Sequence, residues 1–339
     1  MHKSGGSDAR FSFFDLFAGV GGMRLGLERA GFHAVFANDI DRKASLTYNL
    51  NFPEPQMTTE DIWKVDLDET PACRVVAGGF PCQPFSVAGY RRGFKDERQG
   101  NLFFRILDVL DSKKPEALFL ENVKNLQGHD GGRTFSVIKA TLEERGYRIK
   151  YRILNALDYG LPQNRERIYI AGFRDMASFK AFDFPKPVGG RPDFRSLLEE
   201  PDGKYYYNGK PLYEHLKEYD ISFDTAYQWR RVYLRENKKG VVPTLTANMG
   251  SGGHNVPIIR DSRGIRKLTP RECFRLQGFP DDFKLPEISD APLYHQAGNS
   301  VPVPVVELCA VQLKRAMEAS SGELFKPVYR FEVPEANQQ

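Results

Sequence analysis

The chain has 339 residues, of which 41% are hydrophobic, 12% aromatic and 27% charged. These proportions are ordinary for a globular protein and exclude a disordered chain, a collagen-like fibre and a disulfide scaffold. The formal net charge of +4 does not by itself indicate a nucleic-acid binder, since many metabolic enzymes carry as much. The length predicts two domains, or one domain with an insertion.

The sequence gives no sign of a secretion signal or of a membrane-spanning segment. The first ten residues, MHKSGGSDAR, contain no apolar stretch, and no segment approaches the ~18 uncharged apolar residues of a membrane span. We therefore expect a cytoplasmic protein. Cys73, Cys82, Cys273 and Cys309 are too widely spaced for a paired-cysteine metal site, so we expect no metal, no disulfide and at least three buried thiols.

The first half alternates strand-like and helix-like segments. We expect strands over residues 10–17, 33–38, 73–78, 117–120, 148–156 and 167–172, and helices over 23–30, 41–51, 103–110 and 134–145. This alternation predicts an α/β fold with a doubly wound parallel sheet. Such a sheet binds its ligand outside the carboxyl ends of its strands.

The second half has a different character. Residues 182–265 are rich in proline, tyrosine and glycine, with a short helical stretch near His215, and predict a smaller, irregular domain or an insertion without a function of its own. Residues 302–319 are helical in pattern and are expected to pack back on the first domain. Two basic segments, 85–105 and 227–240, are typical of solvated surface but also suit contact with phosphates.

A glycine turn follows the first expected strand, in the run DLFAGVGG. Asp39 comes twenty residues after Gly19, at the end of the next strand, where a carboxylate can bind ribose hydroxyls. This pattern favours an adenosine-bearing cofactor, and its alternative is a tight turn with a capping acid. The spacing is not G-x-G-x-x-G and no Lys-Ser/Thr follows, so S-adenosylmethionine fits better than NAD or ATP.

Three further motifs carry reactive or charged side chains. Cys82 stands between two prolines in GGFPCQPFS, where it could be an activated nucleophile or a structural thiol. Glu121 directly follows a buried strand and could be an acid catalyst or a helix cap. Arg165 and Arg167 are two residues apart in QNRER. They could face one site or belong to a row of charged side chains on the surface.

The motifs taken together resemble those of the DNA (cytosine-5)-methyltransferases of bacterial restriction-modification type. The runs DLFAGVGG, GGFPCQPFS, LENVKNL, LPQNRERIYI, LTPRECFRLQGFP and QAGNSVPVPVV stand in that family's order. The resemblance implies a Rossmann-like S-adenosylmethionine-dependent domain over 1–183. It also implies a smaller target-recognition domain over 184–290 and a C-terminal segment over 291–325 that packs on the catalytic domain.

The resemblance also implies a chemistry for the four reactive positions. Cys82 attacks carbon 6 of a flipped-out cytosine, and Glu121 holds ring nitrogen 3 and the exocyclic amine. Arg167 contacts the cytosine carbonyl oxygen, and Arg165 steadies Glu121 and the phosphate backbone.

The same resemblance assigns the binding residues. Those expected around the cofactor are Phe17, Gly19, Val20, Gly22, Asp39, Ile40, Asp61, Ile62, Gly79, Pro81, Leu102, Asn299 and Ser300. Those expected on DNA are Ser86, Arg98, Gln163, Arg230, Arg231, Thr246, Asn248, Gly252, Gly253 and His254. The run TLTANMGSGGHNVP is similar to that of enzymes reading G/C-rich palindromes of the CCGG or CCNGG kind.

The expected partners are double-stranded DNA and a cognate restriction endonuclease that is not a stable subunit. A monomer associated with the nucleoid through DNA is expected.

Four other readings stay open at this point. A tRNA cytosine-5 methyltransferase shares the catalytic motifs, although the long recognition region favours DNA. A catalytically silent DNA-binding paralogue would not need Cys82, Glu121 and Arg167 together. A regulator fused to the enzyme would need a DNA-binding extension, and a flavin or NAD oxidoreductase leaves the PCQ and QxRxR motifs unexplained.

Overall fold

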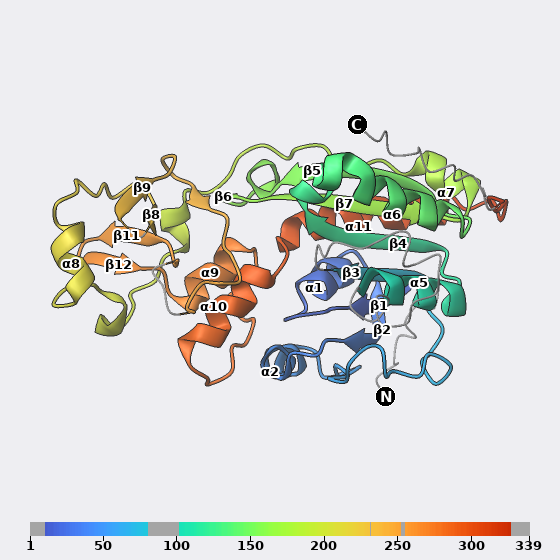
Figure 1. Cartoon of the computed structure of the whole chain (residues 1–339), viewed down its shortest axis with the longest axis horizontal. Helices are drawn as coiled ribbons and strands as arrows, with labels where there is room; N and C mark the ends of the chain where they lie inside the picture. Colours follow the sequence, from blue (N-terminus) through green and yellow to red (C-terminus); the bar gives the residue numbers. More distant parts are fainter. Residues whose placement is uncertain (1–10, 81–101, 231, 252–254, 327–339) are drawn as a thin grey trace, which may run out of the picture.

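A six-stranded sheet forms the framework of the N-terminal half (Figure 1). The computed structural model describes residues 11–80, 102–230, 232–251 and 255–326. The sheet has the strand order β2-β1-β3-β4-β7-β5. Its strands are β1 (Ser12–Leu16), β2 (His33–Asn38), β3 (Val75–Gly79), β4 (Ala117–Val123), β5 (Arg148–Asn155) and β7 (Glu166–Phe173).

One strand of this sheet runs against the others. β2, β1, β3 and β4 pair in parallel, whereas β7 is antiparallel to both β4 and β5. The prediction of an all-parallel sheet is therefore wrong at β7. Residues 156–165, which join β5 to β7, are too few for the helical crossover that parallel neighbours require. As a consequence the first residues of β7 lie beside the last residues of β4, with Arg167 opposite Val123.

The expected helices of the first half are all present. They are α1 (Gly22–Arg29), α2 (Arg42–Asn51), α5 (Leu102–Lys113) and α6 (Arg133–Glu143), with α7 (Met176–Ala181) following the sheet. Short 3-10 turns occupy η2 (Lys124–Leu126), η3 (His129–Gly132) and η4 (Ala156–Tyr159). Asp41 caps the N-terminus of α2, and its carboxylate accepts hydrogen bonds from the amides of Lys43 and Ala44.

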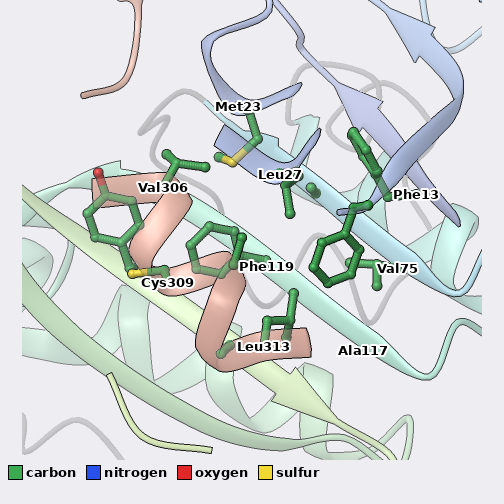
Figure 2. Packing of buried hydrophobic residues seen from close by; sticks show 14 of the residues in the cluster. Phe13, Met23, Leu27, Val75, Ala117, Phe119, Val306, Cys309 and Leu313 are labelled. Atoms are coloured by element: carbon green, nitrogen blue, oxygen red, sulfur yellow. The ribbon is translucent and has the colours of Figure 1, made fainter. Parts of the chain in front are cut away.

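The C-terminal helix returns to the first half of the chain. α11 (Val303–Glu318) inserts Val306, Cys309 and Leu313 into one buried cluster with Leu27 of α1 and Phe119 of β4 (Figure 2). Burial of such side chains is worth about 1.5–3 kcal/mol each, which holds the helix on the sheet.

A second, antiparallel sheet occupies the other end of the molecule (Figure 1). Its order is β12-β11-β8-β9, so the region expected to be irregular has a regular centre of short strands. The elements of this half are η5 (Phe194–Leu197), η6 (Gly203–Tyr205), α8 (Pro211–Leu216), β8 (Tyr227–Arg230), β9 (Tyr233–Glu236), β11 (Ile258–Asp261) and β12 (Gly264–Lys267).

The two halves meet through a continuous buried cluster. Helices α9 (Pro270–Leu276) and α10 (Asp290–Asn299) lie between the two sheets (Figure 1). Tyr48 of α2 and Phe52, which directly follows α2, share a hydrophobic cluster with Leu245, Phe274 and Tyr294. A two-stranded bridge, β6 (Gln163–Asn164) with β10 (Val242–Pro243), adds a second connection. Domain boundaries at 183/184 and 290/291 stay a prediction.

Two simpler features of the sequence can also be placed. Cys73, Cys273 and Cys309 are buried free thiols, as expected, whereas Cys82 lies outside the described residues. None of the helices in the described ranges has the length and apolar character needed to cross a membrane.

Candidate active site

A cavity of about 530 Å³ opens at the edge of the large sheet where β1, β2, β3 and β4 end. Its volume lies in the range of pockets that hold small molecules. The wall is assembled from segments far apart in sequence. They are the turn after β1, the ends of β2, β3 and β4, the start of β7, the segment after β10, and α10.

The turn after β1 presents backbone to the cavity. Gly19 has φ +54°, a conformation that suits glycine, and a Cβ placed there would have no heavy atom within 4 Å. Its amide donates to Asp39 Oδ2 at 2.8 Å, while the Asp41 amide donates to Oδ1 at 2.9 Å. These bonds fix the carboxyl at the cavity wall. Burial raises the pKa of Asp39 above its usual value, although the amide donors oppose the shift.

The cavity lining also offers a hydroxyl without a described partner. Ser300 is buried, and its Oγ has no hydrogen-bond partner among the described residues. Such an atom carries a free-energy cost unless a ligand or water satisfies it. Apolar surface from Phe17, Val20, Phe80 and Val301 completes the lining. The cavity therefore combines a fixed carboxyl, an unpartnered hydroxyl and apolar walls, with no lysine among its described lining residues to grip phosphates.

Glu121 and Arg167 form an ion pair on the same cavity wall. Arg167 Nε lies 3.1 Å from Glu121 Oε1, and both side chains are largely buried. The antiparallel direction of β7 makes this possible, because it places Arg167 beside the end of β4. Burial raises the pKa of Glu121, and the positive charge of Arg167 is the largest influence in the other direction. A carboxyl group in this setting can bind a proton more readily than an exposed glutamate.

Arg165, expected to steady Glu121 and the phosphate backbone, also makes backbone contacts that the resemblance did not imply. Its positive charge acts with that of Arg167 against the rise in the pKa of Glu121. Arg165 is only 2% exposed and donates to the carbonyl oxygens of Leu245 at 2.7 Å, Ser300 at 2.6 Å and Gly298 at 3.1 Å. The guanidinium is thus bonded to three carbonyl oxygens on two backbone segments, which leaves no exposed surface for a phosphate. Burial lowers its pKa to about 9, so the group keeps its charge at neutral pH. Arg167, not Arg165, makes the ion pair with Glu121.

Gln163 is likewise a structural residue in this conformation. It is fully buried, accepts from the Leu245 amide at 3.1 Å and donates to the Leu276 carbonyl at 2.8 Å. The expectation that it contacts DNA is not supported by this placement, since its amide is used within the protein. Together with Arg165 it fastens the segment after β10 to the sheet.

A second cavity of about 410 Å³ lies beside the first, toward the small sheet. Arg230, Thr246 and Asn248, all expected on DNA, line it together with the exposed cations Arg235 and Lys238. Thr246 lines both cavities. The basic rim and polar amides suit an anionic polymer with base edges.

The remaining predicted residues divide into three groups. Eight of the thirteen expected cofactor residues line the first cavity: Phe17, Gly19, Val20, Gly22, Asp39, Gly79, Asn299 and Ser300. Four described ones are not in its lining. Ile40 is 67% exposed, and Ile62 is in the core. Asp61 Oδ1 accepts a hydrogen bond from the Trp63 amide at 3.1 Å, and Leu102, the first residue of α5, packs against the same core cluster as Ile62. Outside the described residues lie Pro81, Cys82, Ser86, Arg98, Arg231, Gly252, Gly253 and His254.

Sequence reasoning missed four polar residues of the first cavity, which are Asp41, Asn122, His295 and Gln296. Asn122 donates to the Phe80 carbonyl at 2.7 Å, which holds the end of β3 against the end of β4. His295 contacts both Ala247 and Asn299. Asn122 could have been singled out as the neighbour of Glu121, whereas a lone histidine on a helix gives no comparable signal.

Comparison with known proteins identifies the family of the fold and cavity. The family model "C-5 cytosine-specific DNA methylase" matches residues 11–315. Type II methyltransferase M.Bsp6I of Bacillus sp. (strain RFL6) is 52% identical over 312 residues, which cover 89% of this chain and 98% of that protein. Type II methyltransferase M.NlaX of Neisseria lactamica is 42% identical over 325 residues, covering 92% of this chain and 98% of the relative.

Solved structures show the same fold. The crystal structure of S. pombe Dnmt2 methyltransferase matches with a TM-score of 0.66 at 22% identity, covering 90% of this chain and 98% of that one. The Entamoeba histolytica methyltransferase EhMeth matches with a TM-score of 0.69 at 19% identity, covering 90% and 97%.

The fold is that of a Rossmann-like methyltransferase. The chain belongs to the C-5 cytosine-specific DNA methylase family. It is a sequence-specific DNA (cytosine-5)-methyltransferase of the Type II restriction-modification class, and it uses S-adenosylmethionine. The first cavity fits this cofactor, because the Asp39 carboxyl can accept from ribose hydroxyls and the Ser300 hydroxyl has no described partner.

Proposed function

We propose that the enzyme methylates carbon 5 of a cytosine that is flipped out of duplex DNA. The reaction proceeds through a covalent adduct between this cytosine and Cys82. The target cytosine lies within a short G/C-rich palindrome of the CCGG or CCNGG kind. The observation that carries the site assignment is the Glu121–Arg167 pair at 3.1 Å, on the wall of the cavity that contains Asp39 and Ser300. The target atom is inaccessible in a stacked duplex, which is the physical reason for flipping.

The covalent step follows from the electronic structure of the ring. Carbon 5 of an aromatic pyrimidine is a weak nucleophile. Attack of the Cys82 thiolate on carbon 6 forms an S–C bond and shifts the ring electrons toward carbon 5 and nitrogen 3. Glu121, whose pKa is raised by burial, donates a proton to nitrogen 3, and Arg167 contacts the ring carbonyl oxygen. Cys82 lies outside the described residues, and in sequence it follows Phe80 of the cavity wall by two positions.

The cofactor assignment extends to named side chains. Gly19, Asp39 and Ser300 would hold S-adenosylmethionine, which supplies an electrophilic methyl group when bound. After carbon 5 gains this methyl group, a water molecule removes the carbon 5 proton and the Cys82 sulfur leaves, which restores aromaticity. The elimination releases the Cys82 thiolate, and nitrogen 3 returns its proton to Glu121.

The recognition residues are proposed from the second cavity and the sequence around it. Arg230, Thr246 and Asn248 face the DNA there, and arginine can read guanine in the major groove through two hydrogen bonds. We place Ser86, Arg98, Arg231, Gly252, Gly253 and His254 on DNA as well, on the resemblance alone. A monomer acts on each site, and a cognate endonuclease cleaves the same sequence when it is unmethylated.

One experiment tests the reaction and the recognition sequence together. Unmethylated genomic DNA is incubated with tritiated S-adenosylmethionine and either the wild-type enzyme or Cys82→Ser, and the products are mapped by bisulfite sequencing. We expect incorporation at cytosine carbon 5 in one short palindrome and none with the variant. Incorporation by Cys82→Ser at the wild-type rate would disprove the covalent adduct, and incorporation into tRNA but not DNA would favour an RNA substrate.

A further inference from the structure

His295 connects the first cavity to the segment after β10, residues 244–249, which we call the recognition segment. It lies on α10, one helical turn before Asn299, and both residues line the first cavity. Its Nδ1 is 2.7 Å from the carbonyl oxygen of Ala247, and its Nε2 is 2.9 Å from the side-chain amide of Asn299. Ala247 belongs to the segment after β10, next to Thr246, which lines both cavities.

The two contacts determine the orientation of the Asn299 amide. A carbonyl oxygen only accepts hydrogen bonds, so the ring must donate to Ala247 through Nδ1–H. In the neutral ring Nε2 is then an acceptor, and the group facing it must be a donor. This requires the NH₂ group of Asn299, not its oxygen, to point at the histidine. Among the described residues no donor contacts the Asn299 Oδ1.

The close approach of α10 to the recognition segment makes this bridge possible. A Cβ on Gly298 would lie 2.1 Å from the carbonyl oxygen of Thr246 and 2.7 Å from the Ala247 amide nitrogen. Only glycine allows the helix and the segment to come this close, and His295 spans the remaining gap. The separation between Ala247 and Asn299 is therefore set by backbone packing, and the ring fits it.

We propose that His295 is a positioning residue for cofactor binding. It holds the Asn299 amide with the oxygen available to an N–H donor of S-adenosylmethionine, which offers the amino group of its methionine part and the exocyclic amine of adenine. The same ring ties that orientation to the Ala247 carbonyl of the recognition segment. The inference rests on the proposed assignment of the first cavity to the cofactor.

Substitutions at 295 can separate this role from simple packing. Glutamine can donate to Ala247 through its NH₂ group and accept from Asn299 through its oxygen, so His295→Gln reproduces both contacts. Lysine has only donors, so His295→Lys keeps the contact with Ala247 but forces the Asn299 amide to turn its oxygen away from the cavity. His295→Leu removes both contacts.

The test measures binding of S-adenosylmethionine to the full chain by isothermal titration calorimetry, without DNA. We expect His295→Leu and His295→Lys each to raise Kd about five- to tenfold, and His295→Gln to stay within about twofold. The double variant His295→Leu/Asn299→Ala is expected to bind no more weakly than Asn299→Ala alone, because the histidine acts through Asn299. Thermal unfolding of each variant checks that it is folded.

The controls distinguish failure of this inference from failure of the cavity assignment. Asp39→Ala should weaken S-adenosylmethionine binding strongly, and unchanged binding would overturn the assignment itself. If Asp39→Ala weakens binding but His295→Lys binds like the wild type, or the double variant shows additive losses, the positioning role is disproved. If His295→Leu does not fold, the Kd values of His295→Gln and His295→Lys are compared instead. Equal values for these two variants would disprove the positioning role.

Discussion

The buried charges at the edge of the large sheet are compensated in different ways. Glu121 and Arg167 compensate each other at 3.1 Å, whereas Arg165 is compensated by three backbone carbonyls. Removing one member of a buried hydrogen-bonded set leaves the others unsatisfied, at a cost of about 1–3 kcal/mol for each group. Substitutions at these positions must therefore be judged by both stability and activity.

Glu121→Gln tests the proton-donating role at the residue scale. Glutamine can still donate a hydrogen bond to nitrogen 3 and accept one from the exocyclic amine, but it cannot transfer a proton. We expect the single-turnover rate of methyl transfer to fall by about 10²–10⁴ while the Kd for DNA changes little. A rate within threefold of the wild type would remove Glu121 from the acid role. Asp130→Asn, at an exposed carboxyl next to Arg133, is the matched control and should leave the rate unchanged.

Asp15 gives a second residue-scale prediction, on pH-dependent stability. The side chain is fully buried at the end of β1. Its Oδ2 is 3.4 Å from the Tyr48 hydroxyl, and its Oδ1 has no partner among the described residues. Burial raises its pKa well above the usual value. The folded chain therefore binds more protons at Asp15 than the unfolded chain does, and this carboxyl makes folding less favourable as pH rises above about 4 toward its folded-state pKa.

The measurement compares urea unfolding of the wild type and Asp15→Asn at pH 5 and pH 8. Asparagine does not titrate, so the difference between the two proteins isolates this carboxyl. We expect the free energy of unfolding of the wild type, relative to Asp15→Asn, to be lower at pH 8 than at pH 5. An equal difference at both values would show that Asp15 titrates alike in both states.

At the scale of elements, the contact between α10 and the segment after β10 decides how the two cavities are joined. Gln163, Arg165 and Gln277 use buried side chains to hold these backbones, and Gly298 lets them touch. The walls of the two cavities therefore share one packed contact. The antiparallel β7 supplies Arg167 to the same place.

Gly298→Ala tests the contact between α10 and the segment after β10 through the sign of its effect on the free energy of unfolding. In a free helix the change from glycine to alanine stabilises by about 1 kcal/mol. Here the new Cβ would meet the Thr246 carbonyl oxygen at 2.1 Å, so we expect a loss of about 3 kcal/mol in the free energy of unfolding, measured by urea denaturation. Gly203→Ala is the control, because a Cβ there meets no atom within 4 Å, and it should change stability by less than about 0.5 kcal/mol. Increased stability of Gly298→Ala would contradict the close approach.

At the scale of the whole molecule, charge distribution matters more than net charge. The formal charge is only +4, yet Arg230, Arg235 and Lys238 line one cavity. This cavity also contains residues of β8 and β9, which lie in the small sheet at one end of the molecule (Figure 1). Phosphate contacts release counterions, so each one steepens the dependence of DNA affinity on salt.

Arg235→Gln is expected to weaken DNA binding and to reduce the slope of log K against log[salt] by about 1. Lys180→Gln removes the same charge from an exposed residue of α7, at the opposite end of the molecule, and should leave the slope unchanged. Fluorescence anisotropy at several salt concentrations measures both. Equal slopes for Arg235→Gln and the wild type would place the DNA elsewhere.

Local features of the chain could be predicted from its sequence. The strands and helices of the first half, the burial of Cys73, Cys273 and Cys309, and the turn that brings Gly19 to Asp39 all depend on patterns within about twenty residues. Propensity, periodicity and glycine turns are encoded at that range. The class of cofactor follows from the same turn, because its spacing suits ribose but not phosphate.

The sequence alone determined these elements and the motifs that define the enzyme class, whereas the tertiary structure decided which charges meet. The direction of β7, the burial of Arg165 and Gln163, the small antiparallel sheet and the bridge through His295 were not predictable. Arg165 bonds carbonyls 80, 133 and 135 positions away, and His295 bonds one 48 positions away. No local pattern reports such partners, because they are selected by the packing of segments that meet only in the folded chain.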